Sequence, residues 1–170
     1  MINKEQMIFL FKDINEELKQ QDIKGEICIV GGAAMTLAFN ARQSTHDVDA
    51  IFNPKNSIQI AAIDAGKKYN LGVDWLNDAV KVFMPEKTSK KQILLNLSNL
   101  VVWSPDASYI LAMKCISSRP TDIRDIIFLI KHLKLKEAKE VFEIIKNYYP
   151  KGKISQKTLD LILSIFEDSL

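Results

Sequence analysis

The chain has 170 residues, a length that suits one domain or one core with a small appended part. Hydrophobic residues make up 47% of the chain and charged residues 26%, which is ordinary for a soluble globular protein. The formal net charge of +2 comes from 23 basic and 21 acidic residues, so bulk charge gives no argument for nucleic-acid binding.

Several signals that would assign the chain to another class are missing. The N-terminal stretch 1–6 lacks the apolar region and cleavage site of a signal peptide. No apolar run approaches the roughly 20 residues of a membrane span. Cys28 and Cys115 lie in apolar runs without a CxxC spacing, so neither a zinc knuckle nor a redox pair is predicted. We expect a cytoplasmic protein with no membrane partner and two buried cysteines.

The first hundred residues alternate between helical and strand-like patterns. In chain order they predict a helix over 3–21, a strand over 26–30, a break at Gly31-Gly32, a helix over 33–40, a polar loop over 41–45, a strand over 46–52 and a helix over 58–69. An irregular segment over 73–78 follows, and then strands over 80–83, 92–97 and 100–103, the first two joined by a lysine-rich hairpin loop over 86–91.

The rest of the chain shows helical spacing only. It predicts helices over 106–118, 121–133, 135–148 and 154–168. We therefore expect an α+β protein in which residues 1–103 form a mixed β-sheet core flanked by helices, and residues 104–170 form a helical part packed on that core.

Two carboxylates stand out in the predicted strand 46–52. Asp47 and Asp49 are two residues apart, so on a strand both leave the same face, roughly 6–7 Å from each other. Carboxylates at that distance repel unless a cation lies between them, and Mg²⁺ with substrate phosphates fits this ligand set. A solvated polar face is the alternative, but the flanking apolar residues indicate a largely buried strand whose carboxylates need partners.

A glycine pair precedes these carboxylates. Gly31-Gly32 follows a hydrophobic strand and opens a helix, where glycines let the backbone approach a ligand and the helix N-terminus favours phosphate. The third glycine of the dinucleotide-binding fingerprint is absent. A simple tight turn is the other interpretation.

Together, the strand ending in Gly-Gly, the helix and the Asp-x-Asp strand resemble the polymerase-β-like nucleotidyltransferase superfamily. The stretch from Val30 to Asp49, with Arg42 and Thr45, is similar to its minimal bacterial members, the AbiEii-toxin-like and DUF6036-like groups. Residues 75–78 and the helical stretch 111–126 also resemble the DUF6036-like pattern. The resemblance covers roughly residues 25–130 and implies a nucleotidyltransferase-like sheet core.

The resemblance also implies roles for individual residues. Gly31 and Gly32 would contact the triphosphate of an NTP, and Asp47 and Asp49 would hold Mg²⁺, with two ions expected. Lys114 would reach a phosphate. The remaining residues assigned to the nucleotide site are Arg42, Thr45, Arg119, Asp122 and Asp125, the last two orienting Lys114 or Arg119. A snorkelling lysine at the edge of the core is the alternative for Lys114.

One departure from the superfamily concerns a third carboxylate, which active members usually carry on a later strand. The predicted strands 92–97 and 100–103 contain no Asp or Glu, and Asn96 stands where one would be sought. Asp74 and Asp78 are the nearby candidates for this carboxylate, and we assign Asp78 a catalytic role.

Some aromatic and basic residues admit two interpretations. Trp75 and Trp103 fit core positions better than base-stacking platforms. Lys87, Lys90 and Lys91 fit a solvated hairpin tip better than an RNA contact.

Two functions follow. The first is a magnesium-dependent nucleotidyltransferase that moves a nucleoside monophosphate from an NTP to an acceptor hydroxyl on RNA, protein or a small molecule. By resemblance, it would work in a toxin–antitoxin or defence pair with a cognate antitoxin or operon partner. The alternative is a catalytically inactive nucleotidyltransferase fold whose helical part engages a protein partner, which the missing third carboxylate motivates.

Overall fold

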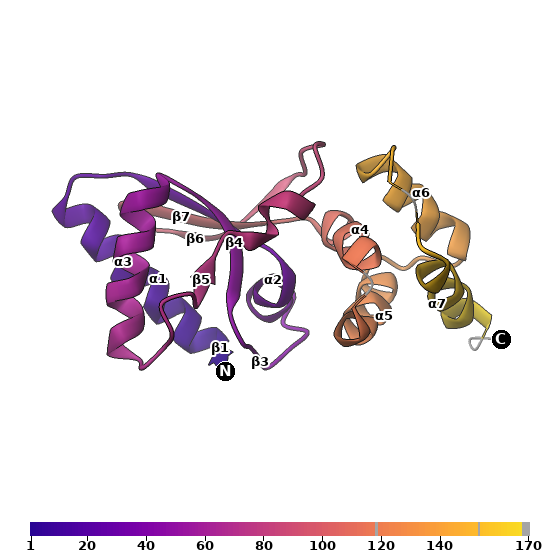
Figure 1. Cartoon of the computed structure of the whole chain (residues 1–170), viewed down its shortest axis with the longest axis horizontal. Coiled ribbons are helices and arrows are strands. Elements are labelled where there is room, and N and C mark those ends of the chain that lie inside the picture. Colours follow the sequence, from indigo (N-terminus) through magenta and orange to yellow (C-terminus); the bar gives the residue numbers. More distant parts are fainter. Residues whose placement is uncertain (118, 153, 168–170) are drawn as a thin grey trace. The chain divides into compact units, whose positions relative to one another are not determined.

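The structure is a computed structural model that describes residues 1–117, 119–152 and 154–167 (Figure 1). It divides into two compact units. The first contains residues 1–82 and 91–105, and the second contains residues 83–90 and 106–170. Among the described residues, no helix combines the length and the apolar character needed to cross a membrane.

The first unit is built on a mixed five-stranded sheet. Its elements are β1 (Ile2–Asn3), α1 (Lys4–Gln20), β2 (Gly25–Ile29), α2 (Gly31–Leu37), β3 (Ser44–Thr45), β4 (Val48–Asn53), α3 (Lys55–Lys68), β5 (Leu76–Asn77), β6 (Lys91–Asn96) and β7 (Leu100–Pro105). The strand order is β5-β4-β2-β7-β6, and β1 pairs with β3 in a separate small sheet. β2 runs antiparallel to β4 and parallel to β7. The expected mixed sheet flanked by helices is confirmed.

Local sequence accounts for where α1 begins and which face it buries. Asn3 forms a capping box with Gln6, in which the Gln6 backbone N–H donates to Asn3 Oδ1 at 2.9 Å. Apolar side chains at helical spacing, from Met7 to Leu18, are fully buried. The helix therefore starts at its polar cap and packs along its apolar stripe.

The core lies between helices α1 and α3 and one face of the sheet. β4 shows the period of two that creates this face, since Val48, Ala50 and Phe52 are buried in the core while Asp49 and Ile51 are only half-buried. We call the opposite face, which carries Asp49 and Ile51, the carboxylate face. Strand pairing adds to this face the residues Glu26, Cys28, Asn77, Ile93 and Trp103.

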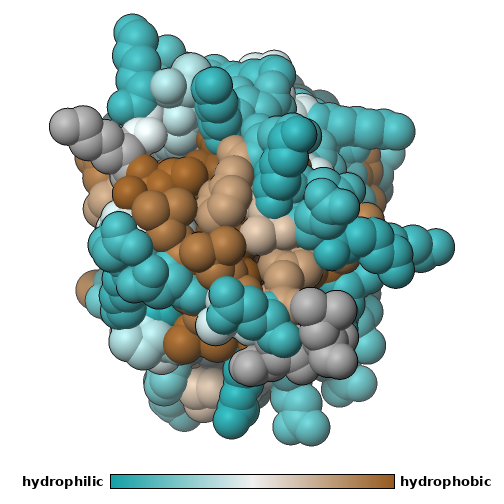
Figure 2. All heavy atoms as spheres, turned by 90° about the vertical axis from the view of Figure 1, so that its right-hand side faces the viewer, coloured by the Kyte–Doolittle hydropathy of each residue, from teal (hydrophilic) through white to brown (hydrophobic). Residues whose placement is uncertain are grey.

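The second unit is helical in the part that the structure describes. Its elements are α4 (Ala107–Ser117), the 3₁₀-helix η2 (Pro120–Asp122), α5 (Ile123–His132), α6 (Ala138–Tyr148) and α7 (Gln156–Glu167). Asp106 caps α4, because its Oδ1 accepts a hydrogen bond from the Tyr109 backbone N–H at 3.0 Å. Figure 2 views the molecule from the right-hand side of Figure 1. On this face, apolar residues are surrounded by polar ones. Leu163 of α7 is 44% exposed.

Some predicted elements differ from the structure. The expected strand 80–83 is wrong, because this segment forms the 3₁₀-helix η1 (Ala79–Phe83), in which Val82 is 81% exposed. The segment 86–91 therefore closes no hairpin, and Lys91 begins β6. The expected helix 121–133 opens as η2. The predicted helix ends at residues 118 and 168 lie outside the described residues.

Both cysteines are buried, as expected. Burial raises the pKa of Cys28 to about 12, and burial together with the nearby charge of Asp122 raises the pKa of Cys115 to about 12. Alkylating reagents attack the thiolate. We therefore expect iodoacetamide at about pH 8, near the usual thiol pKa, to label both cysteines in urea and neither in the folded protein, as read by mass spectrometry. Rapid labelling of the folded protein would contradict this burial.

Candidate functional site

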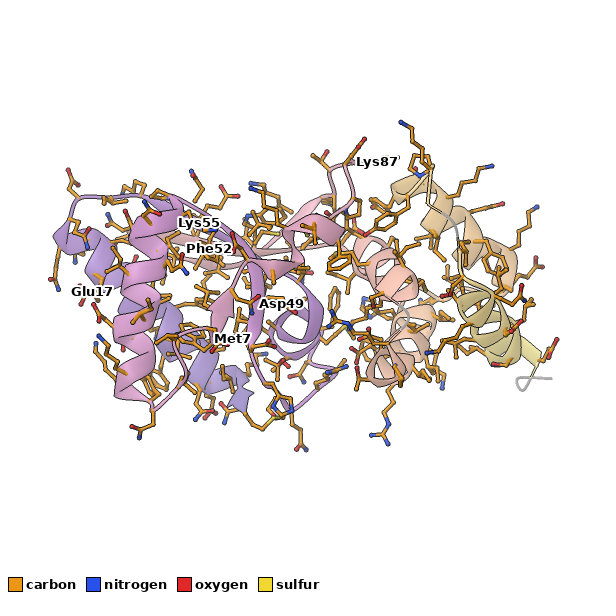
Figure 3. The ribbon with its side chains drawn as sticks, viewed as in Figure 1. Met7, Glu17, Asp49, Phe52, Lys55 and Lys87 are labelled. Atoms are coloured by element: carbon orange, nitrogen blue, oxygen red, sulfur yellow. The ribbon has the colours of Figure 1, made fainter. Side chains whose placement is uncertain are left out.

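The glycine turn and the Asp49 carboxylate meet where β2 ends. Gly31 opens α2 with a φ of +58°, a conformation that glycine adopts without steric cost. A Cβ added at Gly31 would lie 3.1 Å from Asp49 Oδ2. The Val30 backbone N–H donates to the Asp49 carbonyl oxygen at 3.0 Å, which fixes the two segments together. Figure 3 labels Asp49 on β4, the strand against which α2 packs.

Gly32 is enclosed by the loop that leads from α2 to β4. A Cβ added at Gly32 would lie 2.5 Å from Thr45 Oγ1, and Arg42 Nη1 would be 3.7 Å away. Thr45 is buried, with 6% of its side chain exposed, and its pairing with Ile2 holds it in place. The structure thus gathers Arg42, Thr45 and the glycine pair at the turn that also meets Asp49.

The close approach of Gly32 and Thr45 leads to a prediction. Gly32→Ala should cost about 1–3 kcal/mol of stability, because overpacking forces a buried neighbour to move and Thr45 is stiff at χ1. Adding Thr45→Ala removes the nearest atom, although the Cβ of residue 45 stays 3.3 Å away. The double variant should therefore lose less stability than the two single changes added together, as measured by urea midpoints. Strict additivity would contradict the contact.

The two predicted metal ligands are placed differently by the structure. Asp49 lies on β4 and is half-buried, whereas Asp47 lies in an exposed bend before the strand, which starts at Val48. Only Asp49 therefore lies on the strand, and the expectation that Asp47 lies there too is wrong. Both carboxylates still belong to one short segment.

This donor set can be tested against Mg²⁺, the ion that the resemblance implies. Within the described ranges, no group of three or more His, Cys, Asp or Glu side chains could hold a metal ion. Mg²⁺ does not need such a cage, because it usually takes one or two carboxylates together with waters and substrate phosphates. The exposed Asp47 and the half-buried Asp49 fit an ion that arrives with a nucleotide.

The neighbouring strand adds a residue that the sequence did not single out. Asn77 of β5 pairs in parallel register with Asp49, so both side chains lie on the carboxylate face. Its Oδ1 accepts a hydrogen bond from the Ala79 backbone N–H at 3.1 Å. In the sequence, Asn77 is distinguished only by its place within residues 75–78, which resemble the DUF6036-like pattern.

Asp78, the residue predicted to supply the third carboxylate, is paired with a lysine, and Asn96 occupies the strand on which that carboxylate would be sought. Asp78 forms an ion pair with Lys55 at 2.6 Å. The hydrogen bond from Lys55 lowers the pKa of Asp78, whereas a general base works best with a pKa near the operating pH. Asn96 lies on β6, which the strand order separates from β4 by two intervening strands. Asp78 directly follows Asn77, the strand partner of Asp49, and its catalytic role stays a prediction.

The second unit brings together three of the other predicted residues. Lys114 Nζ of α4 lies 2.7 Å from Asp125 Oδ2 and 2.8 Å from Asp122 Oδ1, and all three side chains are buried. Ser117 Oγ lies 2.8 Å from the other Asp122 oxygen as a donor. Arg119 is exposed. The two aspartates therefore hold Lys114, while its contact with a phosphate stays a prediction.

A comparison with known families identifies the family of the chain. The model of a family described as a nucleotidyltransferase of unknown function, DUF6036, matches residues 5–162 and so spans both units. Searches of curated proteins and of solved structures gave no match. The matched range includes the glycine turn, the carboxylate segment and the buried lysine cluster. The chain belongs to the DUF6036 family of nucleotidyltransferases of unknown function.

Proposed function

We propose that the protein is a magnesium-dependent enzyme that transfers a nucleoside monophosphate from an NTP to the hydroxyl group of an acceptor. One observation carries the proposal, namely that the backbone of Gly31 and the carboxylate of Asp49 come so close that a Cβ would lie 3.1 Å from Oδ2. A phosphate at this turn would meet the backbone N–H groups that open α2 and the carboxylate that can hold its counterion.

Each residue at the turn has a defined task in this proposal. Asp49 and Asp47 would hold Mg²⁺, with two ions proposed, and the metal would supply charge neutralisation for the phosphates. The guanidinium of Arg42, which lies near Gly32, suits a phosphate oxygen. Thr45 sets the position of the turn through its contact with Gly32.

In the proposed reaction, one bond forms and one bond breaks at the α-phosphorus of the NTP. The acceptor oxygen forms a bond to the α-phosphorus, the bond from that phosphorus to the β-bridging oxygen breaks, and pyrophosphate leaves. The hydroxyl proton passes to solvent. The protein's own contribution is to position the nucleotide and to stabilise negative charge, which is the main demand of phosphoryl-type transfers.

The acceptor and the setting are proposed on family resemblance. RNA, a protein side chain and a small molecule are the acceptor classes, and a toxin–antitoxin or defence pair with a cognate antitoxin is the setting. The similarity of the stretch from Val30 to Asp49 to AbiEii-toxin-like proteins supports this setting.

Label transfer tests the proposal. The purified protein is incubated with each of the four α-labelled NTPs, Mg²⁺ and the RNA, protein or small-molecule fraction of a cell extract. We expect label to enter one fraction with Mg²⁺ and not with EDTA. Absence of transfer in every combination, together with calorimetric binding of Mg²⁺-NTP, would replace the proposal with an inactive binding module.

A further inference from the structure

The outer side of α5 and the turn that follows it carry exposed cations. Four exposed basic side chains, which we call the basic face, lie in this stretch: Arg124, Lys131, Lys134 and Lys136. Arg124 and Lys131 are seven residues apart on α5, so they share one side of the helix, about 10 Å apart along its axis. The helix buries a different side, which carries Asp125, Ile126, Leu129 and Ile130.

No acidic side chain neutralises the basic face from within its own segment. Asp125 is the one acid in the sequence between residues 123 and 136, and it is buried against Lys114 at 2.7 Å. The next two acids, Glu137 and Glu140, form the capping box of α6, in which Glu140 Oε2 accepts a hydrogen bond from the Glu137 backbone N–H at 2.9 Å. Within the described ranges, none of the four cations lies in an ion pair. The segment therefore presents four positive charges that can meet an anion from outside.

Helix stability does not account for Arg124. This residue lies in the first turn of α5, where the helix dipole favours an acidic side chain and disfavours a cation. Lys131 differs, because a cation in the last turn complements the dipole. An exposed cation at an unfavourable helix position points to a role outside folding, and the binding of an anion is the role that suits a guanidinium.

An aromatic pair lies beside these cations. The rings of Phe128 and His132 are stacked, with centroids 5.8 Å apart and planes 14° apart. Phe128 follows Arg124 by four residues and so neighbours it on the helix, and His132 is exposed. Cations beside a flat ring suit a polymer of phosphates and bases, because a base can stack on such a ring. A membrane surface would need an apolar helix side facing it, whereas the apolar side of α5 is buried.

We propose that the basic face binds the phosphate backbone of a single-stranded RNA and that this RNA is the acceptor. Of the acceptor classes in the proposed function, RNA is the one that is always a polyanion. Each cation that meets a phosphate releases a counterion, so the affinity falls as the salt concentration rises. The inference rests on the proposed function in naming the RNA as the acceptor, whereas the binding itself does not depend on transfer.

Binding can be measured without any reaction. Fluorescence anisotropy of a labelled single-stranded RNA of about 12 nucleotides, within the usual range of site sizes, is recorded without NTP and without Mg²⁺. The double variant Arg124→Gln, Lys131→Gln should bind roughly 25-fold more weakly at about 0.1 M salt, with a salt slope smaller by about 1.4, because two single-strand phosphate contacts are lost. The matched control is Lys146→Gln on α6, an exposed lysine outside the basic face, which should leave the affinity unchanged.

The urea midpoint separates binding from folding. Arg124→Gln alone should leave the midpoint unchanged or raise it, because it removes a cation from the first turn of a helix. Arg124→Lys keeps the charge and should retain the salt slope. Lys134→Gln, in the turn after α5, decides the question if the double variant loses its far-UV circular dichroism, with an expected loss of affinity of about fivefold at about 0.1 M salt.

The outcomes separate this inference from the proposed function. No RNA binding by the intact chain, or unchanged affinity and salt slope in the folded double variant, would overturn it. An equal loss in Lys146→Gln would show a general charge effect and overturn it as well. Binding of phosphatidylserine vesicles without binding of RNA would assign the basic face to a membrane surface instead. Because the measurement contains no NTP, failure of label transfer would count against the proposed function and leave an observed RNA contact intact.

Discussion

Asp49→Asn should reduce label transfer by about 10²–10³-fold, the scale of losing one preorganised electrostatic contact to the reacting group. Asparagine keeps the shape of the side chain and the backbone bond from Val30 to residue 49. It removes the charge that would hold the metal ion against the Gly31 turn. The measurement is the initial rate of label transfer at saturating Mg²⁺ and NTP.

Two comparisons make that result specific. Asp64→Asn on α3 removes an exposed carboxylate that pairs with Lys67, and its transfer rate should match the unmodified protein. Asp47→Asn should also lower the rate, since the proposal gives Asp47 a share of the metal although it lies outside β4. A full transfer rate in Asp49→Asn would remove the carboxylate from the mechanism. Equal losses in Asp49→Asn and Asp64→Asn would show a general charge effect instead.

Lys114→Ala should destabilise the protein by about 3–5 kcal/mol, because it leaves two buried carboxylates without their shared cation. Asp122 and Asp125 both lie within 2.8 Å of Lys114 Nζ, and that side chain is only 5% exposed. The loss is measured as a shift of the urea midpoint followed by far-UV circular dichroism, which reports on the helices of both units.

The control for this prediction is a lysine whose partner is exposed. Lys139 lies 3.9 Å from Glu143 on α6, with 78% of its side chain exposed, so Lys139→Ala should change stability by less than about 0.5 kcal/mol. A similarly small effect of Lys114→Ala would show that the cluster tolerates the loss of its cation. Lys114 would then be available for the phosphate contact that the family resemblance implies.

The two Lys114 interpretations show where sequence reasoning stops. A lysine on the apolar stretch 110–116 signals an unusual position, and Asp122 and Asp125 follow at short range. The sequence does not say whether the charge faces a ligand or a carboxylate, because that depends on how α4 and α5 pack. The structure places the ammonium between the two aspartates and buries it.

The placement of Asp47 and Asn77 has the same cause. Alternation of apolar residues over 46–52 predicts a strand, and β4 does bury Val48, Ala50 and Phe52. Where pairing begins depends on partners distant in sequence. Ile29 pairs with Ala50, the backbone of Val30 bonds to Asp49, and β5 contributes only two residues. A two-residue strand has no period to detect, so Asn77 could not be placed beside Asp49 from sequence.

The residue pattern alone predicts the order of strand, glycine turn, helix and carboxylate strand, the helical C-terminal part and the family resemblance. These features depend on local propensity, on periodicity and on motifs that occupy short stretches of chain. Three further features come from the folded structure: a Cβ on Gly31 would meet Asp49, Lys91 lies over the Trp103 ring, and Lys114 is buried between two aspartates. Each of these depends on long-range pairing or packing, which no local pattern encodes.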